Sequence, residues 1–183
     1  MDPMLDEVDE QDRPTGRLVV RNEVCGNGTS DVLHRCVGVY AFDPEGRMYL
    51  QTHKKSGLLD HSVGGHVDTG EDYATAAKRE AAEELGLVNV PFHELGTSVR
   101  SHEPGRQHMF GIYECFVPKD WVFAPNDEVD NIMPMLLEDV VDMINHHPEH
   151  FTGGLINTLK FYLEVKKSPL RVLINGATKE RED

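Results

Sequence analysis

Hydrophobic and polar positions along the chain first follow the short period of β-strands. Residues 37–42 (VGVYAF) and 48–52 (MYLQT) are compact apolar runs rich in strand-forming side chains. The segment between them, Asp43 to Gly46, carries the Pro and Gly that are typical of a tight turn. The two runs therefore predict a β-hairpin.

The pattern changes to the period of a helix after residue 68. We expect this helix to begin at Thr69 or Gly70, with the two acids at 71–72 in its first turn, where negative charge suits the helix dipole. Residues 73–85 are rich in alanine and have high helix propensity. Gly86 stands where the end of a helix favours glycine. This segment is the strongest helix of the sequence.

The remaining pattern adds strands and then further helices. Strands are expected over residues 87–95, 108–117 and 129–135, and helices over 137–145 and 154–165. Strands on both sides of a central helix, followed by more helices, predict an α/β fold in which a mixed β-sheet is sandwiched between helices.

The length of 183 residues favours one domain with a full core. Residues 1–16 are polar and are expected to form a loosely docked lead-in. We place the domain at residues 17–167 and a C-terminal tail at 168–183, in which only 170–174 has an ordered pattern.

Charge and composition exclude several functional classes. Eighteen Lys and Arg stand against 32 Asp and Glu, a formal net charge of −14, which excludes a generic nucleic-acid binder because polyanions attract cationic surfaces. No apolar run approaches the roughly 18 residues of a membrane-spanning helix. The acidic N-terminal segment lacks the layout of a secretion signal, so a cytoplasmic location is expected. The three cysteines have no CxxC spacing, which argues against a disulfide framework and a structural zinc site and favours inert thiols.

The central helix carries a cluster of carboxylates. Glu80, Glu83 and Glu84 are spaced as i, i+3 and i+4 and therefore share one helix face. Such a face is often simply solvated, but like charges so close together repel, and a hard divalent cation removes that repulsion. The glycines at 64–65 allow a close backbone approach just before the helix, and Arg79 can fix a carboxylate by a bidentate bond. This context favours a magnesium site.

These residues have the spacing of a known motif. Gly65, Glu71 and the run 79–87 reproduce the Nudix box, G-x5-E-x7-R-E-U-x-E-E-x-G-U, where U is a bulky aliphatic residue. One position departs from the motif, because Ala81 stands where Ile, Leu or Val is usual. The chain resembles the Nudix superfamily over roughly residues 5 to 165, and the resemblance implies the Nudix fold.

The resemblance also implies an activity and a set of residue roles. Nudix proteins mostly hydrolyse a nucleoside diphosphate linked to another group, with Mg²⁺ or Mn²⁺ as cofactor. The implied metal ligands are Glu80, Glu83 and Glu84, with the backbone carbonyl of Gly65. Glu71 and Arg79 are implied as the orienting pair. A small phosphorylated substrate is compatible with an acidic protein because the bound cations neutralise its charge.

Other roles stay open at this stage. The general base is either Glu80 or Glu128, and either must reach a metal-bound water. The alternative for Glu128 is a solvated charge in a turn. His34, Arg35 and His66 are candidates for substrate contacts, and the alternatives are histidines bonded to backbone and a solvated arginine.

The segment 62–67 resembles a subgroup close to isopentenyl-diphosphate isomerase, which makes that isomerase the main rival. The isomerase carries a catalytic Cys two residues before a metal-binding His. His66 matches the His, and the match implies a second-metal ligand as its alternative role. Gly64 stands at the Cys position, which favours hydrolysis. A Nudix-like binding module without turnover is the third alternative. Similar proteins are often homodimers, so a homodimer is a further expectation.

Overall fold

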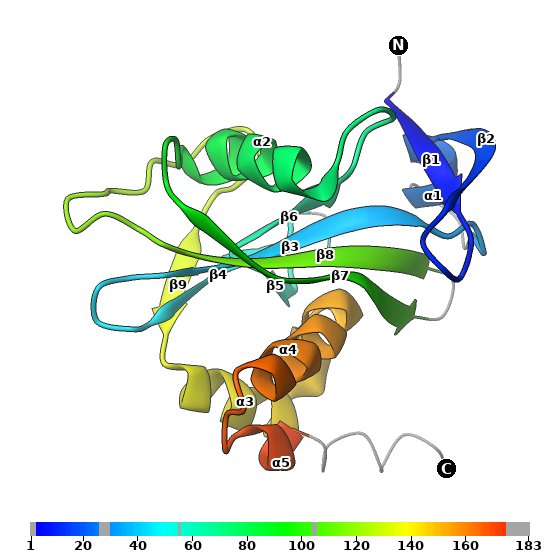
Figure 1. The fold of residues 1–183 in the computed structure, drawn as a ribbon. Coiled ribbons are helices and arrows are strands. Elements are labelled where there is room, and N and C mark those ends of the chain that lie inside the picture. Colours follow the sequence, from blue (N-terminus) through cyan, green and yellow to red (C-terminus); the bar gives the residue numbers. More distant parts are fainter. Residues whose placement is uncertain (1–2, 26–29, 55, 104–105, 175–183) are drawn as a thin grey trace.

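Helices cover both faces of a mixed β-sheet in the computed structural model, which describes residues 3–25, 30–54, 56–103 and 106–174. Helix α2 (Tyr73–Leu85) lies on one face. The other face is covered by α3 (Leu137–His146), α4 (Gly153–Val165) and α5 (Arg171–Ile174), with the short 3-10 turn η1 (Pro148–His150) between α3 and α4 (Figure 1). The predicted α/β fold with a sheet between helices is confirmed.

The centre of the sheet is β3 (His34–Phe42), which pairs in parallel with β8 (Arg106–Phe116) and antiparallel with β6 (Val63–His66). The expected hairpin is present, since β3 also pairs with β4 (Met48–Thr52). The remaining pairs join β4 to β5 (Leu59–Asp60) and β9 (Ile132–Met135), and β8 to β7 (Phe92–Glu103).

Strand β3 separates two hydrophobic cores. Its residues Val37, Val39 and Ala41 pack with the alanine-rich face of α2. The alternate residues Tyr40 and Phe42 pack with the apolar face of α4 on the opposite side. Because both faces are covered, the strand reads as a continuous apolar run instead of an alternating one.

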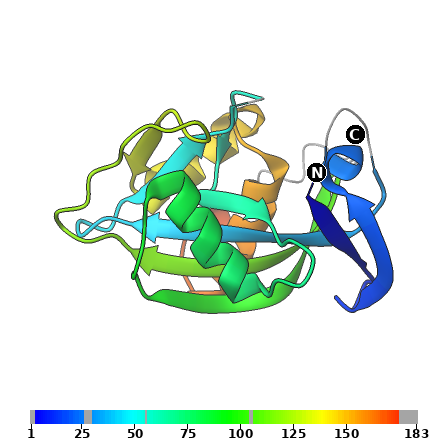
Figure 2. The same ribbon diagram turned by 90° about the horizontal axis from the view of Figure 1, so that it is seen from above.

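The N-terminal segment differs from the expected loose lead-in. Strands β1 (Met4–Val8) and β2 (Pro14–Val20) form a hairpin at one end of the sheet, followed by α1 (Arg21–Cys25) (Figure 2). Leu5 is fully buried, and β1 pairs with β3 at a single position. Few inward apolar side chains anchor this edge hairpin, so the polar pattern concealed it.

Several predicted boundaries were wrong, among them the start of the strand expected over 129–135, which begins at Ile132. Helix α2 begins at Tyr73 because Asp72 is its N-cap and accepts a hydrogen bond from the Thr75 N–H at 2.7 Å. The strand expected over 87–95 begins only at residue 92. Leu87 belongs to the helix end instead, where its N–H donates to the Ala81 carbonyl at 3.0 Å beside Gly86, which has φ 64°.

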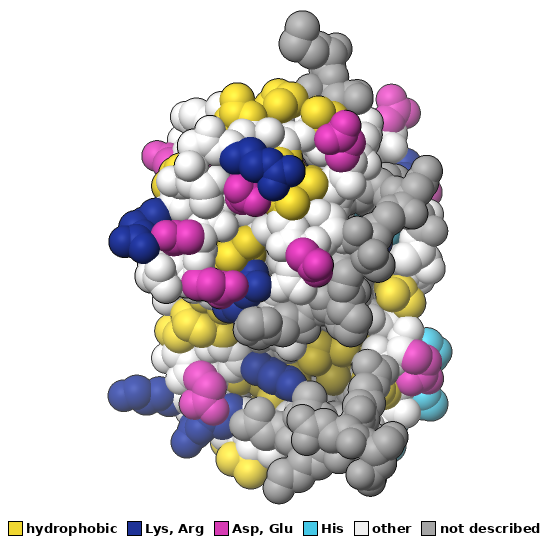
Figure 3. Space-filling view, turned by 90° about the vertical axis from the view of Figure 1, so that its right-hand side faces the viewer, with side chains coloured by type: hydrophobic (Ala, Val, Ile, Leu, Met, Phe, Trp, Pro, Cys, Tyr) yellow, Lys and Arg dark blue, Asp and Glu magenta, His cyan; other side chains and the backbone are white. Residues whose placement is uncertain are grey.

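Charges of both signs lie close together on the face of the molecule in Figure 3. Arg13 pairs with Asp9, and Arg17 pairs with Glu7. No helix among the described residues combines the length and apolarity needed to cross a bilayer.

Candidate active site

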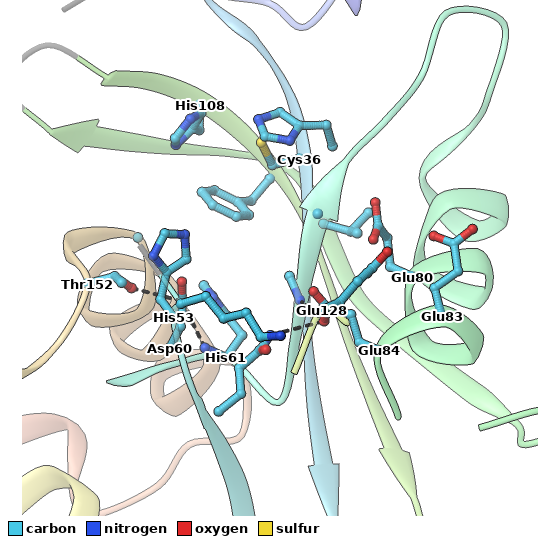
Figure 4. A pocket seen from close by; sticks show the side chains of 18 of the residues that line it. Cys36, His53, Asp60, His61, Glu80, Glu83, Glu84, His108, Glu128 and Thr152 are labelled. Atoms are coloured by element: carbon cyan, nitrogen blue, oxygen red, sulfur yellow. Dashed lines mark hydrogen bonds and ion pairs between the residues drawn. The ribbon is translucent and has the colours of Figure 1, made fainter. Parts of the chain in front are cut away.

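A pocket of about 700 Å³ opens beside the helix and loop that the sequence singled out. One wall consists of the acidic face of α2 and the glycines of β6 (Figure 4). The other walls come from β4 and the residues that follow it, from β5, from β8 and from the start of α4. The pocket therefore lies where the loop before α2 meets the edge of the sheet.

Three carboxylates meet on the α2 side of this pocket. Oxygens of Glu80, Glu84 and Glu128 lie within 4.8 Å of one another. Glu80 and Glu84 are buried, with 5% and 8% of their surface exposed, whereas Glu128 is exposed. Glu83 lies outside this group, and its half-exposed carboxylate accepts a hydrogen bond from Arg79 at 3.1 Å. The structure thus brings together two of the three predicted helix carboxylates with the loop acid.

Arg79 orients several of these groups at once. Its guanidinium donates two hydrogen bonds to Glu71, from Nε at 2.8 Å and from Nη2 at 2.9 Å. Nη1 donates to Glu80 at 2.9 Å, and Nη2 also donates to the His66 carbonyl at 2.9 Å. The Arg79 bond is the main cause that lowers the pKa of Glu71. The pair therefore joins the helix to the preceding loop and fixes the Glu80 rotamer.

Gly65 allows the close approach of β6 to α2. A Cβ atom on this residue would lie 2.0 Å from the Glu80 carboxyl carbon, closer than any real contact. At Gly64 a Cβ atom would meet its nearest neighbour, His61, at 3.7 Å, an ordinary contact. Of the two glycines, only Gly65 is required, because any side chain there would clash with Glu80.

We expect Gly65→Ala to displace the Glu80 carboxylate and to weaken Mn²⁺ binding by roughly 10- to 100-fold. Gly64→Ala is the matched control, because its methyl group fits. Calorimetric Mn²⁺ titration of both folded variants checks this. Equal affinities in the two variants would show that the Glu80 position does not depend on this contact.

Burial determines the protonation of Glu84. Burial raises the pKa of this carboxyl to about 8, against hydrogen bonds from the Gly64 N–H and the Gln51 amide, both at 3.0 Å. Burial also raises the pKa of Glu80, although Arg79 opposes this. Buried carboxylates that resist ionisation are well suited to a cation, because the cation offsets the cost of their charge.

Asn126 holds the loop that carries Glu128. Its side-chain amide donates to the Glu84 carbonyl at 2.9 Å, and its Oδ1 accepts from the Glu128 N–H at 2.8 Å. Lys54 donates to the Asp127 carbonyl at 2.6 Å. The sequence indicated Glu128 through the acidic stretch 126–130 and through the Nudix resemblance. These contacts explain how a residue distant in sequence reaches the helix carboxylates.

Comparison with known proteins agrees with this geometry. A family model described as the NUDIX domain matches residues 32–152. The chain belongs to the Nudix family. The predicted Nudix membership and fold are therefore confirmed.

Two relatives and one solved structure illustrate the similarity of this Nudix chain. It is 40% identical to an uncharacterized Nudix hydrolase of Streptomyces coelicolor over 122 residues, 63% of this chain and 65% of that protein. It is 28% identical to an isopentenyl-diphosphate Delta-isomerase of Pectobacterium atrosepticum over 153 residues, 80% of this chain and 83% of the isomerase. A crystal structure from Deinococcus radiodurans has a TM-score of 0.62 at 23% identity, covering 79% of this chain and 90% of that one. The chain thus spans 65% of the length of the Streptomyces relative.

The three candidates for substrate contacts in this Nudix chain occupy different places. His66 lines the pocket. His34 is 1% exposed, and its ring stacks on His66 with centroids 5.3 Å apart. Arg35 is absent from the pocket lining and forms an ion pair with Asp12 of the N-terminal hairpin at 2.6 Å. Of the three, only His66 is thus placed to meet a molecule in the pocket.

The sequence reasoning named His34 and His66 as candidates but missed the group to which they belong. His34, Cys36, His66 and His108 place one donor atom each within 4.8 Å of one another. Figure 4 shows Cys36 and His108 at the end of the pocket away from the α2 carboxylates. Burial lowers the pKa of all three histidines, that of His108 to about 3, so their rings are neutral. The expected burial of the thiols holds for Cys36 and Cys115, while the Cys25 side chain lies outside the described residues.

Proposed function

We propose that this Nudix protein is a divalent-metal-dependent pyrophosphohydrolase. Its substrate is a nucleoside diphosphate linked to another group, or a related small phosphorylated metabolite. The observation that carries the proposal is the meeting of the Glu80, Glu84 and Glu128 carboxylates at one wall of a pocket. The Streptomyces relative, itself named a Nudix hydrolase, supports the same class.

The carboxylate cluster fits Mg²⁺ or Mn²⁺ in its chemistry. All its donors are oxygens, which hard divalent cations prefer, and the two buried members carry pKa values raised by burial. Glu80 and Glu84 would hold the cation, and the Gly65 carbonyl would be a further ligand. Glu83 shares the Arg79 guanidinium with Glu80. When bound, the cation polarises the diphosphate and lowers the pKa of the attacking water.

The other residues of the site supply the general base and keep the carboxylates in position. Glu128 is the better candidate for the general base, because it is exposed at the pocket and its backbone is fixed by Asn126. Glu80, the other candidate, already accepts a hydrogen bond from Arg79. Arg79 and Glu71 hold the helix and loop together, so that the carboxylates keep their positions. His66 lines the same pocket from β6.

Isomerisation of isopentenyl diphosphate is the second candidate activity. Its support is the isomerase relative and the presence of one thiol, Cys36, in the pocket lining. Against it, Gly64 stands where the isomerase resemblance requires the catalytic thiol. Cys36 lies among imidazoles at a distance from the α2 carboxylates in Figure 4, which disfavours a proton-transfer role beside them.

A substrate panel separates these activities. The protein is incubated with Mg²⁺ or Mn²⁺ and with nucleotide sugars, dinucleotides, nucleoside triphosphates and isopentenyl diphosphate, and phosphorus NMR follows the products. We expect cation-dependent cleavage of at least one diphosphate linkage. Conversion of isopentenyl diphosphate without release of phosphate contradicts the proposal and favours the isomerase. Inertness toward the whole panel contradicts it as well and favours a binding module. The homodimer and the cytoplasmic location remain predictions.

A further inference from the structure

The cluster of His34, Cys36, His66 and His108 combines three imidazoles with a thiol. Its members come from three adjacent strands, since His34 lies opposite His108 in the β3–β8 register and Cys36 lies opposite His66 in the β3–β6 register. Residues that lie opposite one another, or two apart on one strand, share a face of the sheet. All four side chains therefore point to the side of the sheet that carries α4.

A hydrogen bond to the backbone holds one ring of the cluster in a fixed orientation, and a second ring has an unsatisfied nitrogen. The Nδ1–H of His34 donates to the Val32 carbonyl at 3.0 Å. A backbone carbonyl that fixes the tautomer in this way is typical of metal-binding histidines. The buried Nδ1 of His108 makes no hydrogen bond to any residue that the structure describes. Buried polar atoms in folded proteins nearly always have a partner, and an ion is one that would satisfy this nitrogen.

The two donor clusters of the pocket differ in chemistry. The α2 cluster consists of carboxylate oxygens only, whereas this cluster offers nitrogen and sulfur. Nitrogen and sulfur donors select zinc and related borderline-soft cations over magnesium. The cluster offers four donors, which is the number of ligands in a tetrahedral Zn²⁺ site. An aromatic cluster without metal explains the stacking of the rings, but not the buried Nδ1 of His108.

We propose that His34, Cys36, His66 and His108 bind one Zn²⁺ ion at the end of the pocket opposite the carboxylate cluster. Cys36 binds as the thiolate, and its proton is released to solvent. With four protein ligands the coordination is complete, so the ion leaves no open position for water. It ties β3, β6 and β8 together next to Gly64 and Gly65. The inference does not depend on the hydrolase activity.

Metal analysis of the untagged full-length chain tests the site. After purification with zinc and removal of loosely bound metal, we expect about one zinc per chain by mass spectrometry. Replacement by Co²⁺ gives the strong visible bands of tetrahedral cobalt and a thiolate-to-cobalt charge-transfer band in the near ultraviolet. Cys36→Ser abolishes the charge-transfer band, and His108→Ala lowers the zinc content at least tenfold. Cys115→Ala removes a buried thiol outside the cluster and keeps both signals.

Several outcomes overturn the proposal. One is a wild-type chain that binds neither zinc nor cobalt, and another is a cobalt spectrum without the thiolate band. Retention of zinc by folded His108→Ala contradicts it too. Loss of zinc in Glu84→Gln together with retention in His108→Ala places the metal at the carboxylates and also contradicts it. If His108→Ala does not fold, the cobalt spectra of the wild type and Cys36→Ser decide.

Discussion

Glu84→Gln is expected to lower kcat/KM by roughly three orders of magnitude on whichever panel compound the wild type cleaves. The amide side chain keeps the size of the carboxylate but removes one negative ligand of the cation. The transition-state stabilisation from the bound cation is worth several kcal/mol, and each 1.36 kcal/mol is about a tenfold change in rate. Steady-state kinetics at saturating Mg²⁺ measures this. Glu138→Gln, an exposed change on α3, is the control and should leave kcat/KM unchanged.

The same substitution is expected to stabilise the metal-free protein at alkaline pH. Burial raises the pKa of Glu84 from 4.5 to about 8, so its contribution to stability is fully present below about pH 4.5 and is lost as the pH rises through about 8. The wild-type Tm in chelator should therefore fall between about pH 5 and pH 9, and Mg²⁺ should restore it. In Glu84→Gln the fall should be smaller, leaving a Tm roughly 2–6 °C above the wild type at about pH 9. A Tm of Glu84→Gln below that of the wild type at this pH would contradict the expected destabilisation by the buried Glu84 charge.

Arg79→Ala is the second change with a large expected effect. It removes the bidentate bonds to Glu71 and leaves the carboxylates of partly buried Glu71 and buried Glu80 without their cationic partner. We expect the free energy of unfolding to fall by about 2–3 kcal/mol, because a broken ion pair leaves uncompensated charge. We expect kcat/KM to fall roughly 100-fold, since an orienting group of a metal site is lost. Urea unfolding and steady-state kinetics measure the two effects.

Arg79→Lys separates charge from geometry. Lysine keeps the positive charge but cannot form the fork that holds Glu71 and the His66 carbonyl together. This variant should regain most of the stability and stay at least about tenfold below the wild type in kcat/KM. Wild-type activity in Arg79→Lys would mean that a simple charge suffices and that the orienting role is wrong.

The sequence predicted the part of the site that lies on one helix and the loop before it. Fixed spacing on α2 places Glu80 and Glu84 on one face. Gly65 and Glu80 are both positions of the Nudix box, and their close contact requires glycine at residue 65. The helix start was wrong by three residues or more because an Asp at position 72 caps the helix more effectively than Thr69. Local spacing is therefore informative where the ligands share one element.

The sequence could not predict contacts between elements. Glu128 reaches the cluster through Asn126, whose partners are backbone carbonyls of α2 that no pattern reveals. Cys36 and His108 were passed over because metal spacing was sought along the chain, whereas their proximity follows from the register of β3 with β8. Arg35 carried a charge suited to phosphate, but the N-terminal hairpin provides Asp12 as its partner.

Binding of Mn²⁺ to the carboxylate cluster is the most direct test of the proposed catalytic centre. The metal-free protein is first loaded with zinc at the histidine cluster and then titrated with Mn²⁺ by electron paramagnetic resonance, as wild type, as Glu80→Gln with Glu84→Gln, and as Glu138→Gln. The account predicts Mn²⁺ binding by the wild type and by Glu138→Gln, and at least a 100-fold weaker affinity in the double variant, on the order expected when metal ligands are removed. Equal Mn²⁺ affinity in all three proteins would contradict it.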